Sequence, residues 1–231
     1  MDIFEFMKHG NLSSIGMQYE ICPECSAVAY DLYAPIAGIE CRSCGKPIHS
    51  HRWFFQDLLL LDLIREAYNS IPESGDANQA YPHDAERTHA AAVIVLFCTL
   101  KELLLLRFMY SLINAKELAD PIQERLVADN NTHEKRRRKL FPSLVGVSWD
   151  DALLAVETEE PAEFSSLDKF LEEITNVRNE FVHKGIFAHL DVLNAKQCVL
   201  FLVPLLELYV RLNNRYVHPI RLDAIRKKNL S

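Results

Sequence analysis

Residues 175–185, TNVRNEFVHKG, place Arg178, Asn179 and His183 close together just ahead of a glycine. An arginine is always charged and can stabilise the extra negative charge on a phosphorane, whereas a histidine can take or supply a proton near neutral pH. Asn179 could hold the scissile phosphate or orient the imidazole. These three residues are therefore the candidate catalytic residues of a site for metal-independent cleavage of RNA.

The positions of these residues on a helix limit how they can cooperate. Asn179 and His183 are four residues apart and share a face, whereas Arg178 and His183 are five apart and diverge by about 140°. Gly185 predicts that the helix ends there, and a loosened last turn could swing His183 toward Arg178. A symmetric dimer would bring two copies of the motif around one cleft. The alternative is an ordinary helix terminus, where arginine and histidine complement the helix dipole.

Four of the six cysteines form two CxxC pairs, CPEC at 22–25 and CRSC at 41–44. Two such turns about 15 to 20 residues apart have the spacing of a tetrahedral zinc site. Four thiolates close the coordination shell, so we expect one structural zinc ion and no catalytic metal. His49 or His51 could replace one cysteine. The candidate metal ligands are Cys22, Cys25, Cys41 and Cys44.

The overall composition limits partners and compartment. The chain has 231 residues and a formal net charge of −7, which argues against a protein coated for non-specific nucleic-acid binding. The remaining cysteines, Cys98 and Cys198, lie in apolar helical runs and are expected to be small buried hydrophobes. No secretory signal is recognisable at the N-terminus, so we expect a cytoplasmic protein without a disulfide framework.

One basic run stands out on this acidic chain, EKRRRK at 134–139. Such a run could contact an RNA backbone, although charge runs are usually solvated faces. The candidate RNA-binding residues are Lys135, Arg136, Arg137, Arg138 and Lys139.

Two apolar stretches, at 90–100 and 198–210, raise the question of a membrane. Both are shorter than the roughly 20 apolar residues that a spanning helix needs. We therefore expect buried helices and no membrane partner.

Apolar periodicity predicts a mainly α protein with a small β-rich zinc ribbon at its N-terminus. The long helix should be central because its middle is apolar all round, and the last helix should kink at Pro204. A capping box at Ser165 and Asp168 should start the helix that carries the motif. The expected helices lie at 52–70, 85–118, 121–129, 132–141, 148–156, from just after Ser165 and Ser166 to about Gly185, and at 192–216. The expected parts of the chain are the ribbon at 1–52, a connecting helix and linker at 53–83, a helical bundle at 84–217 and a basic tail at 218–231.

The spacing of Arg178, Asn179 and His183 inside a C-terminal all-α region resembles the Arg-x(4-6)-His motif of the HEPN superfamily. A long early helix with an acidic residue in its second half, Glu102, and a final apolar helix after the motif agree with this resemblance. It covers roughly residues 84–217. The resemblance implies a HEPN-like helical bundle that forms a homodimer through the motif face.

The same resemblance implies an endoribonuclease that leaves 2′,3′-cyclic phosphate and 5′-OH ends, as in toxin–antitoxin and anti-phage defence systems. His183 would be the general acid or base, Arg178 the phosphorane stabiliser and Asn179 a polar aid. RNA and an antitoxin or regulatory protein would be the partners. Some HEPN toxins carry a modified tyrosine two positions after the histidine; that position is Gly185 here, so this regulation is not expected. The alternative is a non-catalytic dimerisation module whose zinc ribbon recruits a protein or nucleic acid.

Overall fold

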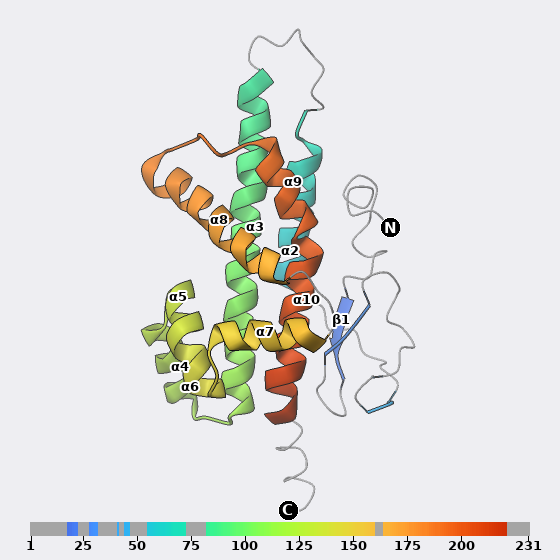
Figure 1. Cartoon of the computed structure of the whole chain (residues 1–231), viewed down its shortest axis with the longest axis vertical. Coiled ribbons are helices and arrows are strands. Elements are labelled where there is room, and N and C mark those ends of the chain that lie inside the picture. The colour runs from blue at the N-terminus through green and yellow to red at the C-terminus, as the bar shows by residue number, and fades with distance from the viewer. Residues whose placement is uncertain are drawn as a thin grey trace, which may run out of the picture.

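The computed structural model describes residues 18–22, 28–31, 41, 44–46, 55–72, 82–159 and 164–220. Over these residues the chain is mainly helical, as Figure 1 shows. The mainly α class predicted from the sequence is confirmed. The predicted linker spans 71–83; its residues 73–81 and most of the predicted tail, 221–231, lie outside the described residues, whereas from Pro82 onward the chain is already helical.

Helix α3, Pro82–Ala115, is the central element and runs along the length of the bundle (Figure 1). Because its middle is apolar on every side, it can be covered from several directions at once. Among the described elements, four helices make the most extensive contacts with it. They are α2 (Phe55–Asn69), α8 (Phe164–Lys184), α9 (Val192–Leu200) and α10 (Leu202–Leu212).

The chain between α3 and α8 consists of short helices that fold back beside the C-terminal half of α3 (Figure 1). The segment predicted as one helix at 132–141 contains a π-helical turn, in which the backbone hydrogen bonds span one more residue than in an α-helix, so that the side chains after it point in a different direction. The elements are α4 (Asp120–Asp129), α5 (His133–Lys135), the π-helical turn η1 (Arg136–Leu140), α6 (Phe141–Val145) and α7 (Trp149–Glu159).

The last long helix is interrupted close to Pro204, as predicted. Helix α9 ends at Leu200, Phe201 leaves the helical conformation with a ψ of 2°, and α10 begins at Leu202. Proline has no N–H to donate to the carbonyl four residues earlier, here that of Leu200, and its ring clashes with that carbonyl. The chain continues from α10 into a second π-helical turn, η2 (Asn213–Val217).

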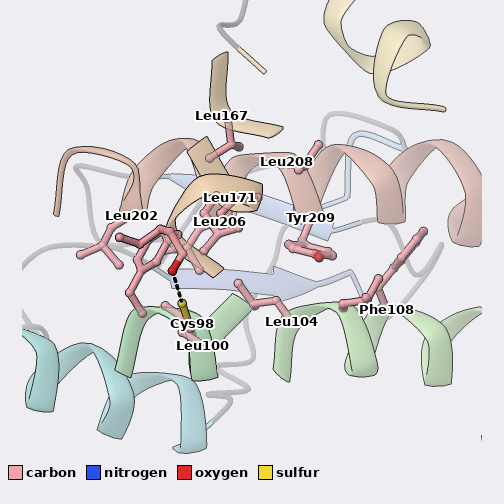
Figure 2. Packing of buried hydrophobic residues seen from close by; sticks show 14 of the residues in the cluster. Cys98, Leu100, Leu104, Phe108, Leu167, Leu171, Leu202, Leu206, Leu208 and Tyr209 are labelled. Carbon is pink, nitrogen blue, oxygen red and sulfur yellow. Dashed lines mark hydrogen bonds between the residues drawn. The ribbon is translucent and has the colours of Figure 1, made fainter. Parts of the chain in front are cut away.

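Aromatic side chains join four helices at the centre of the core. The ring centroid of Phe108 on α3 lies 5.9 Å from Phe141, 6.4 Å from Trp149 and 6.2 Å from Tyr209. Such edge and tilted contacts add to the free energy gained by burying the rings. Figure 2 shows Phe108 and Tyr209 among the surrounding leucines. This cluster fixes α6, α7 and α10 against α3.

The two isolated cysteines are buried in the core, as predicted. Cys98 and Cys198 are both 0% exposed. The thiol of Cys98 on α3 donates to the carbonyl oxygen of Ile174 on α8 over 3.8 Å, the dashed line in Figure 2. This contact holds the middle of α8 against α3, near the motif.

The start of α8 differs from the prediction. The helix begins at Phe164, so Ser165 lies inside its first turn and cannot cap it. Asp168 does not complete a capping box because its carboxylate pairs with Arg137 on η1. A tertiary ion pair therefore replaces the local hydrogen bond that the sequence indicated.

Two short strands precede the helices. Strand β1 (Gln18–Ile21) pairs antiparallel with β2 (Val28–Asp31), with Gln18 opposite Asp31 and Ile21 opposite Val28. Cys22, the first residue of the first CxxC, directly follows β1, and β2 contacts α10. The remaining strand predicted at the second CxxC, within 46–51, lies largely outside the residues that the structure describes.

The two apolar stretches lie within helical segments that are longer than the stretches themselves. Segments Glu86–Ala115 and Val192–Ile220 are long and apolar enough to cross a membrane by length and composition, and 56% and 44% of their most apolar windows are buried in the bundle. The expectation that they are too short is wrong, because the apolar residues continue beyond Lys101 and Pro204. Core helices of soluble proteins pass the same test, so this feature alone says little about location.

Replacing Phe108 by alanine should destabilise the bundle by about 3 to 5 kcal/mol, because it leaves a cavity between four helices. Chemical denaturation followed by far-UV circular dichroism measures this change. Leu193→Ala is the matched control, since Leu193 is 72% exposed and should change stability by less than about 0.5 kcal/mol. Equal effects of the two substitutions would contradict the described core.

Candidate functional site

Helix α8 carries all three candidate catalytic residues in its last two turns. Its buried side is an apolar stripe that includes Leu167, Phe170, Leu171 and Ile174. This stripe fixes the rotation of α8 on the bundle, so the polar residues between the apolar ones lie at its edges or face solvent.

Arg178 lies at the edge of α8 that meets α3. Its guanidinium donates to the Glu102 carboxylate, and the two side chains are 20% and 43% exposed. A charge-assisted hydrogen bond between two helices holds the guanidinium in place while part of it stays open to solvent. The acidic residue noted in the second half of the long helix is therefore the direct partner of the candidate arginine.

His183 does not lie beside Arg178. Helix α8 stays helical through Lys184 and ends at Gly185, which has a φ of 65° and donates its N–H to the Phe181 carbonyl over 2.9 Å. The predicted helix end is confirmed, but the loosened last turn is not found. Arg178 and His183 diverge by about 140° around the helix axis, so a single copy of the chain does not bring them together.

The end of α8 where His183 is exposed is also apolar. Val182, Ile186 and Phe187 are 51%, 40% and 56% exposed, respectively. Beside them lies a hollow of about 630 Å³ between α8, the turn after it and the N-terminal half of α3. Exposed apolar residues that gather around a hollow mark a surface for another molecule. The lining includes Arg87, Ala91, Val95, Phe181, Phe187 and Leu190.

The basic run at 134–139 contains both largely buried and exposed cationic side chains. Arg137 is 15% exposed, donates to both carboxylate oxygens of Asp168 over 3.1 and 3.2 Å, and lies 5.3 Å above the Trp149 ring. Arg138 faces solvent, 3.4 Å from Glu134. Lys139 is exposed, whereas Lys135 and Arg136 are half-buried. The run is therefore not one solvated face, because Arg137 connects η1 to α8.

A polar seam crosses the apolar bundle where α3, α5–η1 and α8 meet. We use this name for Lys101, Glu102, His133, Arg136, Arg137, Asp168, Thr175 and Arg178. Lys101 lies at the inner end of the seam and is 3% exposed, and its ammonium group donates a hydrogen bond to the Thr175 hydroxyl. Burial lowers the pKa of Lys101 because the charged form loses its hydration.

His133 is the seam residue that the sequence did not indicate. It begins α5, where the Thr132 hydroxyl accepts the backbone N–H of Lys135 over 3.2 Å. Burial, together with repulsion from Lys101, Arg137, Arg136 and Arg178, lowers the pKa of His133 to about 3. One sequence signal could have found it, namely that His133 precedes Arg136 and Arg137 by three and four residues on the same helical face.

Three of the four candidate zinc ligands lie together. The sulfur atoms of Cys22, Cys41 and Cys44 are within 4.8 Å of one another, and those of Cys22 and Cys44 are 3.6 Å apart. A tetrahedral ion with Zn–S bonds of about 2.3 Å places its sulfur ligands about 3.8 Å apart, so this spacing fits zinc. It is too long for a disulfide, in which the sulfurs are about 2.05 Å apart.

Backbone hydrogen bonds join Cys41 to the residues that follow Cys44. The N–H of Gly45 donates to the Cys41 carbonyl over 2.7 Å, and the N–H of Cys41 donates to the backbone carbonyl of Lys46 over 2.8 Å. Gly45 has a φ of 68°, which favours glycine at this position. Cys25, His49 and His51 lie outside the described residues, so the complete ligand set stays a prediction.

Comparisons with known proteins found no family model, no curated protein and no solved structure that matches this chain. The likeness to the HEPN superfamily therefore stays a prediction that depends on the motif residues and their helical context. Any function must be argued from the side chains themselves.

Replacing His133 by glutamine should make the protein less sensitive to acid. The pKa of histidine is about 6.5 in an unfolded chain and about 3 at position 133 in the folded chain. Between these values the unfolded chain binds the additional proton, so this group lowers stability as pH falls, by up to about 1.4 kcal/mol per pH unit.

Urea denaturation of wild type and His133→Gln at a series of pH values checks this expectation. The stability difference between the two should shift in favour of the variant as pH falls from about 6.5 toward about 4. Taking the difference removes the contribution of the carboxylates, which both proteins share. His189→Gln is the control, because His189 is exposed. A pH-independent difference would show that His133 is not held neutral.

Proposed function

We propose that this protein is a metal-independent endoribonuclease of the HEPN type. One observation carries the proposal: Glu102 holds Arg178 at a partly open seam while His183 remains exposed at the end of the same helix. An anchored arginine and an accessible histidine are the two groups that phosphodiester cleavage without a metal needs. In this proposal residues 84–217 are a HEPN-like bundle and residues 1–52 a zinc ribbon.

The reaction follows from the chemistry of these side chains. The ribose 2′-oxygen attacks the adjacent phosphorus, and the bond to the 5′-oxygen of the next nucleotide breaks. His183 accepts the 2′-OH proton or donates one to the leaving 5′-oxygen, and Arg178 stabilises the phosphorane. Asn179 shares a face with His183 and is the polar aid that orients the phosphate or the imidazole. The products carry 2′,3′-cyclic phosphate and 5′-OH ends.

A homodimer would complete the site. Since α8 stays helical to its end, Arg178 and His183 of one chain cannot converge. The exposed apolar residues at the end of α8, with Phe187 56% exposed, provide a surface for a second copy. A twofold arrangement over this surface would bring the histidine of one copy to the arginine of the other.

The proposed function includes a cellular role. An endoribonuclease of this kind would act in the cytoplasm on RNA, in a toxin or anti-phage defence role. An antitoxin or regulatory protein would restrain it. Lys135, Arg136, Arg138 and Lys139 would contribute to RNA contact, with Arg138 and Lys139 best exposed for it.

The ion pair between Arg178 and Glu102 also favours a second function, one without catalysis. Glu102 already compensates the charge of Arg178, so the arginine has less positive charge to offer a phosphate. The chain would then be a non-catalytic dimerisation module, and the cysteine cluster would recruit a protein or nucleic acid. Cleavage assays separate these two functions.

Purified protein should cleave a fluorescent RNA in EDTA, and His183→Ala or Arg178→Ala should each lower the rate by about 10² to 10⁴-fold. His189→Ala is the matched control, since His189 is exposed in the turn after α8 and has no part in the proposed chemistry. Product ends are identified by their sensitivity to a cyclic phosphodiesterase. If a folded dimer cleaves no RNA, or if His183→Ala cleaves as wild type, the binding-module function replaces this one.

Mixing the two inactive variants tests whether the site is shared between copies. If each site takes arginine from one chain and histidine from the other, half of the dimers in an equal mixture carry one intact site. About a quarter of the wild-type rate should then return. No recovery, with subunit exchange verified by differently tagged copies, would exclude a site shared in this way.

The cysteine cluster should hold about one zinc ion per chain, with Cys25 as the fourth ligand. Cys41→Ser and Cys44→Ser should each lower the zinc content measured by mass spectrometry after gel filtration, whereas Cys198→Ala, in the core, should retain it. Because the helices have their own core, the variants should keep most of their helical circular dichroism. Unchanged zinc content in both serine variants would contradict the assignment.

A further inference from the structure

We propose that the polar seam between α3, α5–η1 and α8 is a binding site for a phosphoryl group, with Lys101, Arg136 and Arg178 as its cationic ligands. The site differs from the exposed surface around His183, which lies at the end of α8. It shares Arg178 with the proposed ribonuclease site, but it does not require ribonuclease activity.

The cations of the seam outnumber its carboxylates, so an anion could compensate the excess positive charge. Arg137 is paired with Asp168, and Arg178 with Glu102. Within the part of the chain that the structure describes, neither Lys101 nor Arg136 has a carboxylate at ion-pair distance. Among the described residues, the only other carboxylate that pairs with a seam cation is that of Glu172, 4.0 Å from Arg137 and 67% exposed. The seam therefore holds more positive than negative charge.

Donor groups in the seam also lack partners. The Nε atom of Arg136 is buried and has no hydrogen-bond acceptor. The ammonium of Lys101 has three donors, and Thr175 accepts one of them. A buried cation without a counter-ion lowers stability, and structures tolerate it where a ligand supplies the missing charge. The oxygens of a phosphoryl group would accept from both Lys101 and Arg136.

The outer end of the seam provides the entrance. Lys101 itself is 3% exposed, but the neighbouring Glu102 and the Arg178 that pairs with it are 43% and 20% exposed. An anion that approaches Arg178 would compete with Glu102 for the guanidinium, and the displaced carboxylate would turn into solvent. This exchange explains how a nearly closed seam can take a ligand.

His133 adds a neutral donor to these cations. The charges of Lys101 on α3, Arg178 on α8 and Arg136 and Arg137 on its own segment act on the imidazole, and all four oppose its protonation. A neutral imidazole can donate one N–H to a phosphate oxygen without adding to the repulsion. Arg136 and Arg137 begin the π-helical turn η1, and such turns recur at functional sites.

Calorimetric titration with inorganic phosphate tests the proposal. Wild type should bind phosphate, Lys101→Met should weaken binding by at least about tenfold, and Lys196→Met should bind as wild type. Lys196 is the matched control because it is an exposed lysine on α9, away from the seam. No binding by wild type, or equal binding by Lys101→Met, would overturn the proposal.

Two further measurements guard against a folding defect. Without phosphate, Lys101→Met should unfold at the same temperature as wild type or a higher one, since it removes a buried cation. Arg136→Gln changes a half-buried side chain and should also weaken phosphate binding by at least about tenfold. If Arg136→Gln is folded and binds phosphate as wild type, Arg136 is not a ligand and the proposed site is wrong.

The source of the phosphoryl group is decided by competition. A short RNA without terminal phosphates that displaces inorganic phosphate would identify a backbone diester as the ligand, whereas displacement only by a mononucleotide would identify a free monoester. His183→Ala should bind phosphate as wild type even though its rate of RNA cleavage is strongly reduced. Loss of cleavage in His183→Ala with retained phosphate binding therefore separates this inference from the proposed function.

Discussion

The burial of α3 on several sides is the constraint on which the remaining structure depends. A helix that is apolar all round must be covered by neighbours, and α2, α8, α9 and α10 supply that cover. Lys101 and Glu102 interrupt its apolar sequence near the middle, so the covering helices must also provide polar partners there. Thr175 and Arg178, one turn apart on α8, meet this need. The polar seam is thus a consequence of placing charged residues on the central helix.

The electrostatics of the seam follow from its position. In a medium less polar than water, charges act on one another more strongly, and uncompensated ones are costly. Arg137 reduces this cost through Asp168 and the Trp149 ring, whereas His133 does so by remaining neutral. The residues next to Arg137 and His133 in the sequence do not by themselves determine the ion pair of Arg137 or the neutral form of His133. The ion pair and the neutral histidine both arise because segments far apart in the sequence meet in the seam; Arg137 and Asp168, for example, are 31 residues apart.

The extent to which sequence predicts this structure depends on the range of the interaction involved. The kink near Pro204 and the helix end at Gly185 were predictable, because backbone geometry decides both within a few residues. The start of α8 was not, since Asp168 pairs with a distant arginine rather than capping its own helix.

The same distinction applies to the candidate site. Motif spacing indicates Arg178 and His183, and the sequence also drew attention to Glu102. It did not establish the burial of His133 or the inward direction of Arg137, because both depend on how η1 packs against α3 and α8. Tertiary packing, and not residue type, decides which members of a basic run are exposed.

The rigidity of α8 determines how any chemistry at its end can be assembled. Buried Ile174 on its inner face and the ion pair of Arg178 with Glu102 fix its rotation, and the hydrogen bond from Gly185 to Phe181 keeps its last turn helical. The arginine therefore stays at the seam and the histidine stays on the outer surface. A reaction that needs both must use a second molecule of the chain, and the apolar residues around Phe187 are where that molecule would bind. The seam needs no such partner, because all of its ligands come from one chain.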